Sequence, residues 1–133
     1  FPNQVKENTA EFEIGEWRVE VSPREAAAAD RFLNVMQVMD RETAPLPVKR
    51  IEGENLSGML LAGVTVLFRN DGVRTDRPVR FRSEGNRFLA TDLAEGIWQV
   101  WRDGAVVSPA VSVSAEQGTL WFEGSPGTYE LRR

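Results

Sequence analysis

Apolar and polar residues alternate along much of this chain, which is typical of strands that bury only one face. From Pro78 to Ser83, for example, Val79 and Phe81 share one face while Arg80 and Arg82 share the other. Similar segments, separated by Gly, Pro, Asn and Asp, lie at residues 10–14, 16–21, 48–52, 57–62, 64–68, 78–83, 87–91, 97–101, 105–107, 111–113, 118–123 and 128–131. The pattern predicts an all-β fold: an antiparallel β-sandwich of two packed sheets, with roughly ten to twelve short strands and at most one short helix.

Three short sequences predict where the chain turns. Asn70-Asp71-Gly72 is a strong turn signal, and Asp103-Gly104 predicts a two-residue hairpin. Glu84-Gly85-Asn86 connects the segment at 78–83 to the segment at 87–91. We expect Arg87 to pair with the preceding strand across that turn.

Residues 22–39 fit two different structures. The first four, SPRE, have the form of a helix start, with Ser as N-cap, Pro at the first helical position and Glu at the third. Apolar residues at spacings of three, four and seven would continue a helix, namely Phe32, Val35, Met36 and Met39. However, Leu33 and Val38 fall outside that face, and a strand at 32–39 would be apolar on both faces, as in the middle of a sandwich. The residues alone leave both structures open.

The composition narrows the class of protein. A length of 133 residues favours one domain over residues 1–133. A net charge of −4 argues against a nucleic-acid partner, and no apolar run is long enough for a membrane span. The chain contains no His and no Cys, which excludes an imidazole base, a thiol nucleophile and a His-based zinc site. Because it opens on Phe1, we expect a mature product or an excised fragment.

Residues 17–23 read WRVEVSP and, after a short Ala-rich spacer, residues 30–40 read DRFLNVMQVMD. From Gly15 to Asp40 the sequence resembles the C-terminal β-sheet region of the heparinase II/III-like polysaccharide lyases. Those enzymes have a helical toroid followed by antiparallel β-sheets, and they cleave acidic polysaccharides by β-elimination. The resemblance favours a short helical turn at 22–30 and then a strand at about 31–39.

Basic residues gather between Arg69 and Arg87, and three of them could hold an acidic sugar chain. Arg80 and Arg82 share one strand face, and Arg87 could join them across the turn. A planar guanidinium binds a carboxylate or sulfate through two parallel hydrogen bonds. The alternative is an ordinary solvated sheet face whose Arg side chains pair with nearby Asp and Glu.

Tryptophans offer a second possible contact with sugar. Trp98 and Trp101 differ by three positions, so in a regular strand they point to opposite faces. We therefore expect one of them in the core and the other more exposed, where an indole face could stack on a pyranose ring. The alternative is that all four Trp residues serve packing.

No catalytic residue can be assigned. Lyases of the resembled type use a Tyr or His to move protons, but those residues lie upstream of the part that this chain resembles. Tyr129 is the only tyrosine and sits in an alternating segment, so we expect a structural role. No carboxylate pair has a spacing that specifies an acid and a base, and we expect neither a metal nor a cofactor.

The resemblance implies the C-terminal β-sandwich domain of a periplasmic or secreted bacterial lyase that acts on uronate-containing polysaccharide. We expect this chain alone to be non-catalytic and its parent protein to be a polysaccharide lyase. This domain would pack against the upstream helical toroid and form one wall of the substrate cleft. Two alternatives stay open: a free-standing carbohydrate-binding module for acidic glycans, with Arg80, Arg82, Arg87, Trp98 and Trp101 as candidate residues, or a structural and interaction domain.

Overall fold

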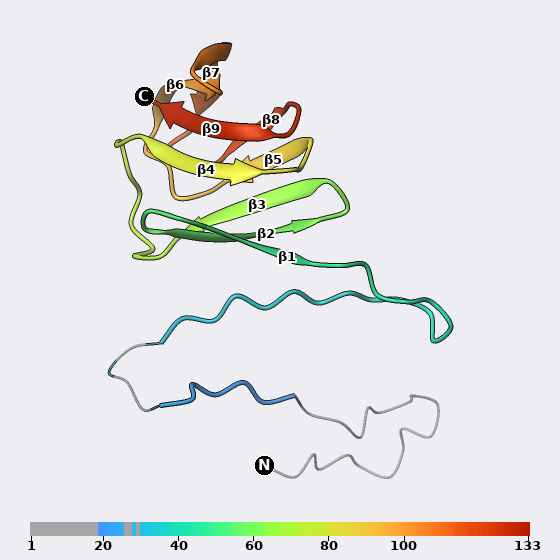
Figure 1. Cartoon of the computed structure of the whole chain (residues 1–133). Helices are drawn as coiled ribbons and strands as arrows, with labels where there is room; N and C mark the ends of the chain where they lie inside the picture. The colour runs from blue at the N-terminus through green and yellow to red at the C-terminus, as the bar shows by residue number, and fades with distance from the viewer. Residues whose placement is uncertain (1–18, 26–27, 29) are drawn as a thin grey trace, which may run out of the picture. The chain divides into compact units, whose positions relative to one another are not determined.

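The computed structural model describes residues 19–25, 28 and 30–133 (Figure 1). The chain divides into two units, residues 1–30 and residues 31–133. All strands of the described residues belong to the second unit: β1 (Lys49–Gly53), β2 (Leu56–Leu61), β3 (Val64–Arg69), β4 (Val79–Ser83), β5 (Arg87–Ala90), β6 (Gly96–Arg102), β7 (Ala105–Val113), β8 (Leu120–Glu123) and β9 (Gly127–Arg132).

The strands form two packed sheets, which confirms the predicted all-β sandwich. One sheet has the order β1-β2-β3-β5-β8 and the other the order β4-β9-β6-β7. Neighbours are antiparallel except β3 and β5, which run parallel. The described part contains nine strands, fewer than the expected ten to twelve, and no helix that could cross a membrane.

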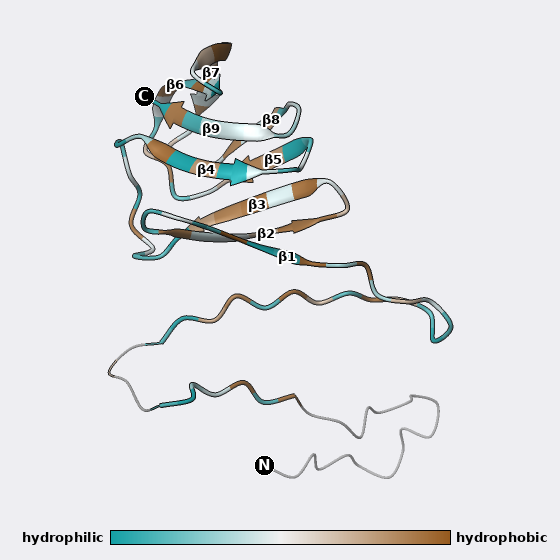
Figure 2. Ribbon diagram, viewed as in Figure 1, coloured by the Kyte–Doolittle hydropathy of each residue, from teal (hydrophilic) through white to brown (hydrophobic). Residues whose placement is uncertain are grey.

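The sheets bury the apolar side of each alternating segment. Along β4, Val79 and Phe81 are 5% and 3% exposed, whereas Arg80 and Arg82 point outward. Figure 2 shows the resulting alternation of hydrophobic and hydrophilic residues along this strand. Such burial is the main favourable contribution to folding, since each large apolar side chain removed from water contributes about 1.5–3 kcal/mol.

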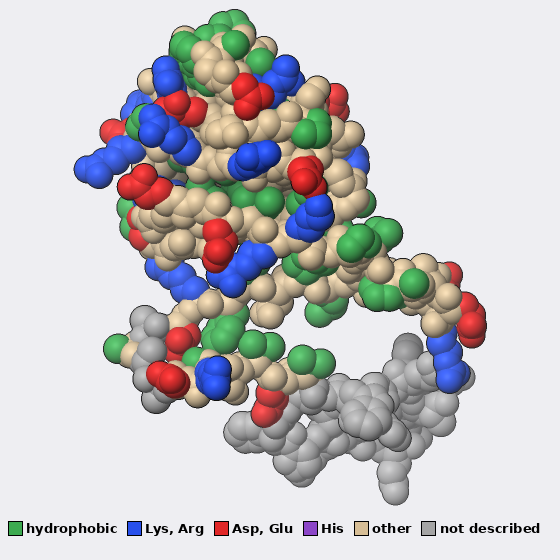
Figure 3. Space-filling view, in the orientation of Figure 1, with side chains coloured by type: hydrophobic (Ala, Val, Ile, Leu, Met, Phe, Trp, Pro, Cys, Tyr) green, Lys and Arg blue, Asp and Glu red, His purple; other side chains and the backbone are tan. Residues whose placement is uncertain are grey.

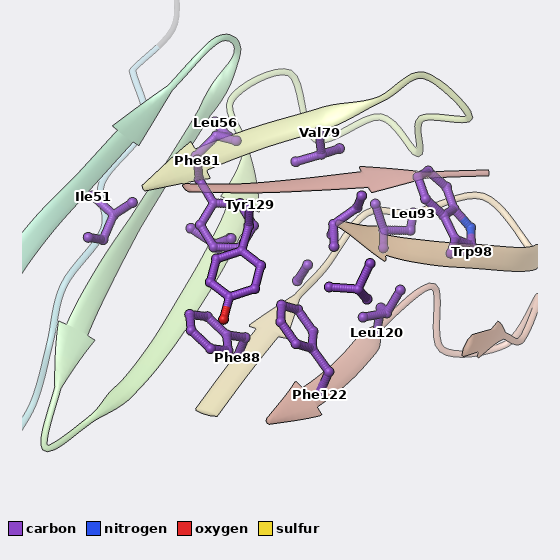
Figure 4. Packing of buried hydrophobic residues seen from close by; sticks show 14 of the residues in the cluster. Ile51, Leu56, Val79, Phe81, Phe88, Leu93, Trp98, Leu120, Phe122 and Tyr129 are labelled. Carbon is purple, nitrogen blue, oxygen red and sulfur yellow. The ribbon is translucent and has the colours of Figure 1, made fainter. Parts of the chain in front are cut away.

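Four aromatic rings join the two sheets at the centre of the core (Figure 4). Phe81 and Tyr129 come from β4 and β9 of the four-stranded sheet, and Phe88 and Phe122 come from β5 and β8 of the five-stranded sheet. The ring centre of Phe88 lies 4.7 Å from that of Phe122 and 4.6 Å from that of Tyr129. Phe81 stacks on Tyr129 at 5.4 Å. These contacts hold the sheets face to face.

The chain passes from one sheet to the other between β4 and β5, so the expected pairing of Arg87 across this turn is wrong. A side chain at Gly85 would begin 2.5 Å from the Thr65 hydroxyl, so the backbone can pass here only without one. The Ser83 hydroxyl lies 2.6 Å from that of Thr65 and accepts a hydrogen bond from the Gly85 amide. This close approach directs β5 alongside β3 instead of back along β4.

The other two turn predictions are confirmed. β6 and β7 form a hairpin in which Asp103 and Gly104 have φ of 50° and 86°, as a two-residue turn of the primed type requires. Asn70 and Asp71 form the turn that ends β3. Asp71 stabilises it by accepting a hydrogen bond from the Val73 amide.

The predictions for the N-terminal third have mixed outcomes. The strand expected at 31–39 is wrong, because these residues have no regular secondary structure. The segment at 10–14 lies outside the described residues, as do residues 16–18 of the strand expected at 16–21; residues 19–21 form no strand. Of the helical turn expected at 22–30, residues 26, 27 and 29 lie outside the described part, and the described residues 22–25, 28 and 30 form no helix. A single sandwich over residues 1–133 stays a prediction.

Replacing Phe88 by Ala tests the aromatic cluster. Phe88 is fully buried, so we expect Phe88→Ala to lower the free energy of unfolding by about 3–5 kcal/mol, measured by urea titration. Ile97→Ala is the control, because Ile97 is 57% exposed and its loss should cost less than about 1 kcal/mol. Equal losses in the two variants would contradict a core centred on Phe88.

Candidate functional site

Three of the predicted site residues lie together on the outer face of the four-stranded sheet. Arg80 and Arg82 point outward from β4. In the strand register Arg80 lies opposite Glu130 of β9, which lies opposite Trp101 of β6. Arg132 also points outward from β9, two residues after Glu130. We call Arg80, Arg82, Trp101, Glu130 and Arg132 the basic face.

Glu130 is the centre of the basic face. One of its carboxylate oxygens lies 2.9 Å from Arg80 Nη2 and the other lies 2.6 Å from Arg132 Nη2. The guanidinium carbon of Arg132 lies 4.1 Å from the centre of the Trp101 ring, a cation–π contact. Hydrogen bonds from Arg132 and then from Arg80 hold the pKa of Glu130 below its usual value. The glutamate therefore fixes both guanidinium groups and neutralises part of their charge.

The other two predicted residues lie elsewhere. Arg87 is on β5 in the opposite sheet, where its guanidinium donates a hydrogen bond of 3.3 Å to the Ala62 carbonyl. Trp98 is fully buried, and its indole nitrogen donates to the Ala94 carbonyl at 2.9 Å. A buried indole presents no face to a sugar, so only Trp101 of the expected pair is open to solvent. Sequence analysis missed Arg132, because its contact with Trp101 depends on the pairing of β6 with β9.

Tyr129 has the structural role expected from the sequence. Its side chain is fully buried in the aromatic cluster, and its hydroxyl donates a hydrogen bond of 2.5 Å to the Ser125 carbonyl. Burial raises the pKa of this phenol. A phenol that is enclosed and engaged in this way cannot reach a sugar chain to move its protons.

The described residues contain no cluster of acidic side chains that could hold a metal ion. In the Asn70-Asp71-Gly72 turn, the only carboxylate is engaged in contacts within the protein. Asp71 accepts hydrogen bonds from the Arg69 guanidinium, the Asn55 amide and the Val73 amide. The hydrogen bond from Arg69 is the largest cause that depresses the pKa of Asp71 far below its usual value. The carboxylate stabilises a turn.

A different surface, on the outside of the five-stranded sheet, is apolar. One row of outward positions crosses four strands: Met59 of β2, Val66 of β3, Leu89 of β5 and Trp121 of β8. We call these residues the apolar row. Trp121 is 49% exposed, and the other three are half-buried. Figure 3 shows that Lys and Arg are interspersed with Asp and Glu on the visible side of the sandwich.

The family described as the heparinase II C-terminal domain matches residues 50–133, which include every strand from β2 to β9 and nearly all of β1. A search among curated proteins finds no match to the chain. The matched range contains the basic face and the apolar row.

The contacts of Glu130 predict a pH dependence. A carboxylate whose pKa is lower in the folded state contributes stability above its unfolded pKa and loses it as the pH falls through the folded value. We expect Glu130→Gln to be less stable than the parent protein at pH 7, and the difference to shrink below about pH 4. Urea midpoints across pH 3–7 measure it. Glu123→Gln, on the exposed side of β8, is the control; a pH-independent difference at Glu130 would contradict the ion-pair explanation.

Proposed function

The chain belongs to the heparinase II C-terminal domain family, and from that premise we propose that it is the non-catalytic accessory sandwich of a heparinase-like lyase. The family prediction rested on Gly15 to Asp40, whereas the matched residues are 50–133, so the sandwich itself carries the family relationship. In this proposal the catalytic residues belong to an upstream helical domain. The whole protein acts in the periplasm or outside a bacterial cell on uronate-containing polysaccharide by β-elimination.

The apolar row is the observation that carries the accessory role. A sheet face that meets only water usually exposes polar side chains, as β4 does with Arg80 and Arg82. Here the corresponding positions of four adjacent strands are Met, Val, Leu and Trp. Large exposed apolar patches on soluble proteins commonly mark interaction surfaces, and half-exposed Trp is among the residues that contribute most to binding. We assign the apolar row to docking of the catalytic domain.

Burial of Tyr129 supports the non-catalytic part of the proposal. β-Elimination from a uronate needs a base for the proton next to the carboxyl group and an acid for the leaving oxygen. It also needs groups that neutralise the carboxylate as negative charge develops. The only tyrosine is enclosed in the core, and the chain has no histidine. The basic face could supply charge neutralisation, but the proton transfers would come from the partner domain.

Docking can be tested with the catalytic domain of the lyase produced separately. We expect it to bind the 133-residue chain, and Trp121→Ala to weaken binding by about 2 kcal/mol, or about 30-fold in Kd, by calorimetry. Ile97→Ala, which removes an exposed apolar residue from the other sheet, should leave Kd unchanged. Absence of binding would contradict the accessory role. So would formation of unsaturated uronate by the chain alone, followed by its ultraviolet absorbance.

A free-standing carbohydrate-binding module is the second candidate. The observation in its favour is that Arg80, Arg82 and Trp101 share one face. Arg80 also lines a cavity of about 330 Å³, together with Arg69, Arg77 and the acidic Glu54. The open sheet would suit a long sulfated chain more than a single sugar. Against it stands Glu130, whose carboxylate already pairs with Arg80 and Arg132.

Binding of heparin to the isolated chain at two salt concentrations tests this second candidate. If the basic face is a binding site, Arg80→Ala with Arg82→Ala should weaken binding about tenfold or more, and higher salt should weaken it further. Glu130→Gln should strengthen binding, because it removes the competing carboxylate. Arg87→Ala, in the opposite sheet, is the matched control. Heparin affinity that is indifferent to all three positions of the basic face would reject the candidate.

A further inference from the structure

The unit of residues 31–133 contains a groove with a cavity volume of about 690 Å³. The extended segment 31–35 forms one wall, and outward side chains of β1, β2 and β3 form the other. This volume lies within the range of about 300–1,000 Å³ that is typical of sites for small ligands. The groove is separate from the basic face, which lies on the other sheet.

Positive charge lines the groove. Three of its lining residues are Arg31, Arg50 and Arg69, and no Asp or Glu is among the lining residues. Asn34 and Asn70 add amide groups that can donate hydrogen bonds. A half-enclosed site that is lined by the exposed Arg31 and Arg50, and by no carboxylate residue, favours an anionic ligand.

The three arginines are held to different degrees. Arg69 is fixed by Asp71, which accepts from Nε at 3.3 Å and from Nη2 at 2.7 Å, and its side chain is only 16% exposed. Arg50 pairs with Glu52 in a largely exposed contact, which an incoming anion can displace at little cost. Arg31 makes no ion pair within the described residues, so its guanidinium is available to a ligand.

The turn after β3 brings Arg31 to the groove. The guanidinium nitrogens of Arg31 lie 3.8 Å from where a Cβ of Gly72 would stand, so the arginine lies over the Asn70-Asp71-Gly72 turn. Gly72 has φ of 64°, a conformation that favours glycine and that this turn requires. Arg31 and Arg69 therefore approach the same end of the groove, one free and one already fixed.

The remaining lining is apolar and partly aromatic. Phe32 comes from the extended segment, and Met59 and Phe68 come from β2 and β3. Phe32 and Phe68 are 49% and 39% exposed, so their rings are open to a ligand. A pyranose ring has an apolar C–H surface that can lie against such side chains, and a uronic acid carries a carboxylate directly on that ring.

We propose that the groove between segment 31–35 and strands β1–β3 binds a uronic acid residue, with Arg31 and Arg50 on its carboxylate and Phe32 and Phe68 against its ring. This inference rests on the proposed function, because that function supplies an acidic polysaccharide as the ligand. Met59 connects the groove to the apolar row, whose other end is Trp121. A catalytic domain docked on the apolar row would border the groove at Met59, and the groove could there hold one end of the polysaccharide.

The test is calorimetry of the whole 133-residue chain with an alginate tetrasaccharide, whose only charges are uronate carboxylates. We expect binding that weakens with salt, a loss of about tenfold or more in Arg31→Ala, and a comparable loss in Phe68→Ala. The same tetrasaccharide with its carboxyl groups reduced to alcohols should not bind. Arg31→Ala should remain folded, because Arg31 is exposed and lies outside the strands. Arg133→Ala, which removes an exposed arginine that lies outside both the groove and the basic face, is the control and should leave affinity unchanged.

Three results would overturn the groove assignment. These are no binding of the alginate tetrasaccharide, equal binding of its carboxyl-reduced form, or a loss of affinity in Arg80→Ala that Arg31→Ala does not share. Binding of an acidic peptide or a fatty acid in place of alginate would assign the groove to another ligand class. Docking of the catalytic domain is measured separately through Trp121. The groove assignment can therefore be wrong while the accessory role is right, and the accessory role can be wrong while the groove assignment is right.

Discussion

Packing of four aromatic rings between the two sheets is the interaction on which this structure depends. Phe81 and Tyr129 from one sheet meet Phe88 and Phe122 from the other, with ring centres 4.6–6.0 Å apart. Neither sheet could bury its apolar side alone, so the cluster makes them one cooperative unit. The cluster also contains Tyr129, the only tyrosine of the chain, whose phenol is therefore not available for proton transfer to a substrate.

Because the inward positions are used for packing, any function of the sandwich must use its outer faces, and these differ. The four-stranded sheet presents Arg80, Arg82 and Arg132 around Glu130, whose single carboxylate neutralises part of their charge. The five-stranded sheet presents an apolar row that ends at Trp121, beside a groove lined by three arginines. The apolar row and the groove lie on the same sheet, so the two proposed contacts, with a partner domain and with an acidic polymer, are neighbours on one face.

Local alternation was enough to predict most of the sandwich. It correctly placed Arg80 and Arg82 on one face and separated Trp98 from Trp101, because side chains in a strand alternate whatever the strand pairs with. It could not predict which strands become neighbours. The chain passes between the sheets at Gly85, where it packs against Thr65, twenty residues earlier. Because of this passage, Arg87 lies in the five-stranded sheet and not on the basic face. The apolar residues at 31–39 looked like an inner strand, but a strand requires pairing partners that no local pattern specifies.

Oxidative footprinting of the tryptophans, with and without the separately produced catalytic domain, would test the accessory role most directly. Trp121 is 49% exposed and Trp101 is partly exposed, and they lie on the outer faces of opposite sheets; Trp98 is buried and serves as an internal reference. Docking through the five-stranded sheet predicts that the catalytic domain protects Trp121 and leaves Trp101 as reactive as before. Protection of Trp101 alone, or of neither tryptophan, would contradict docking through the apolar row.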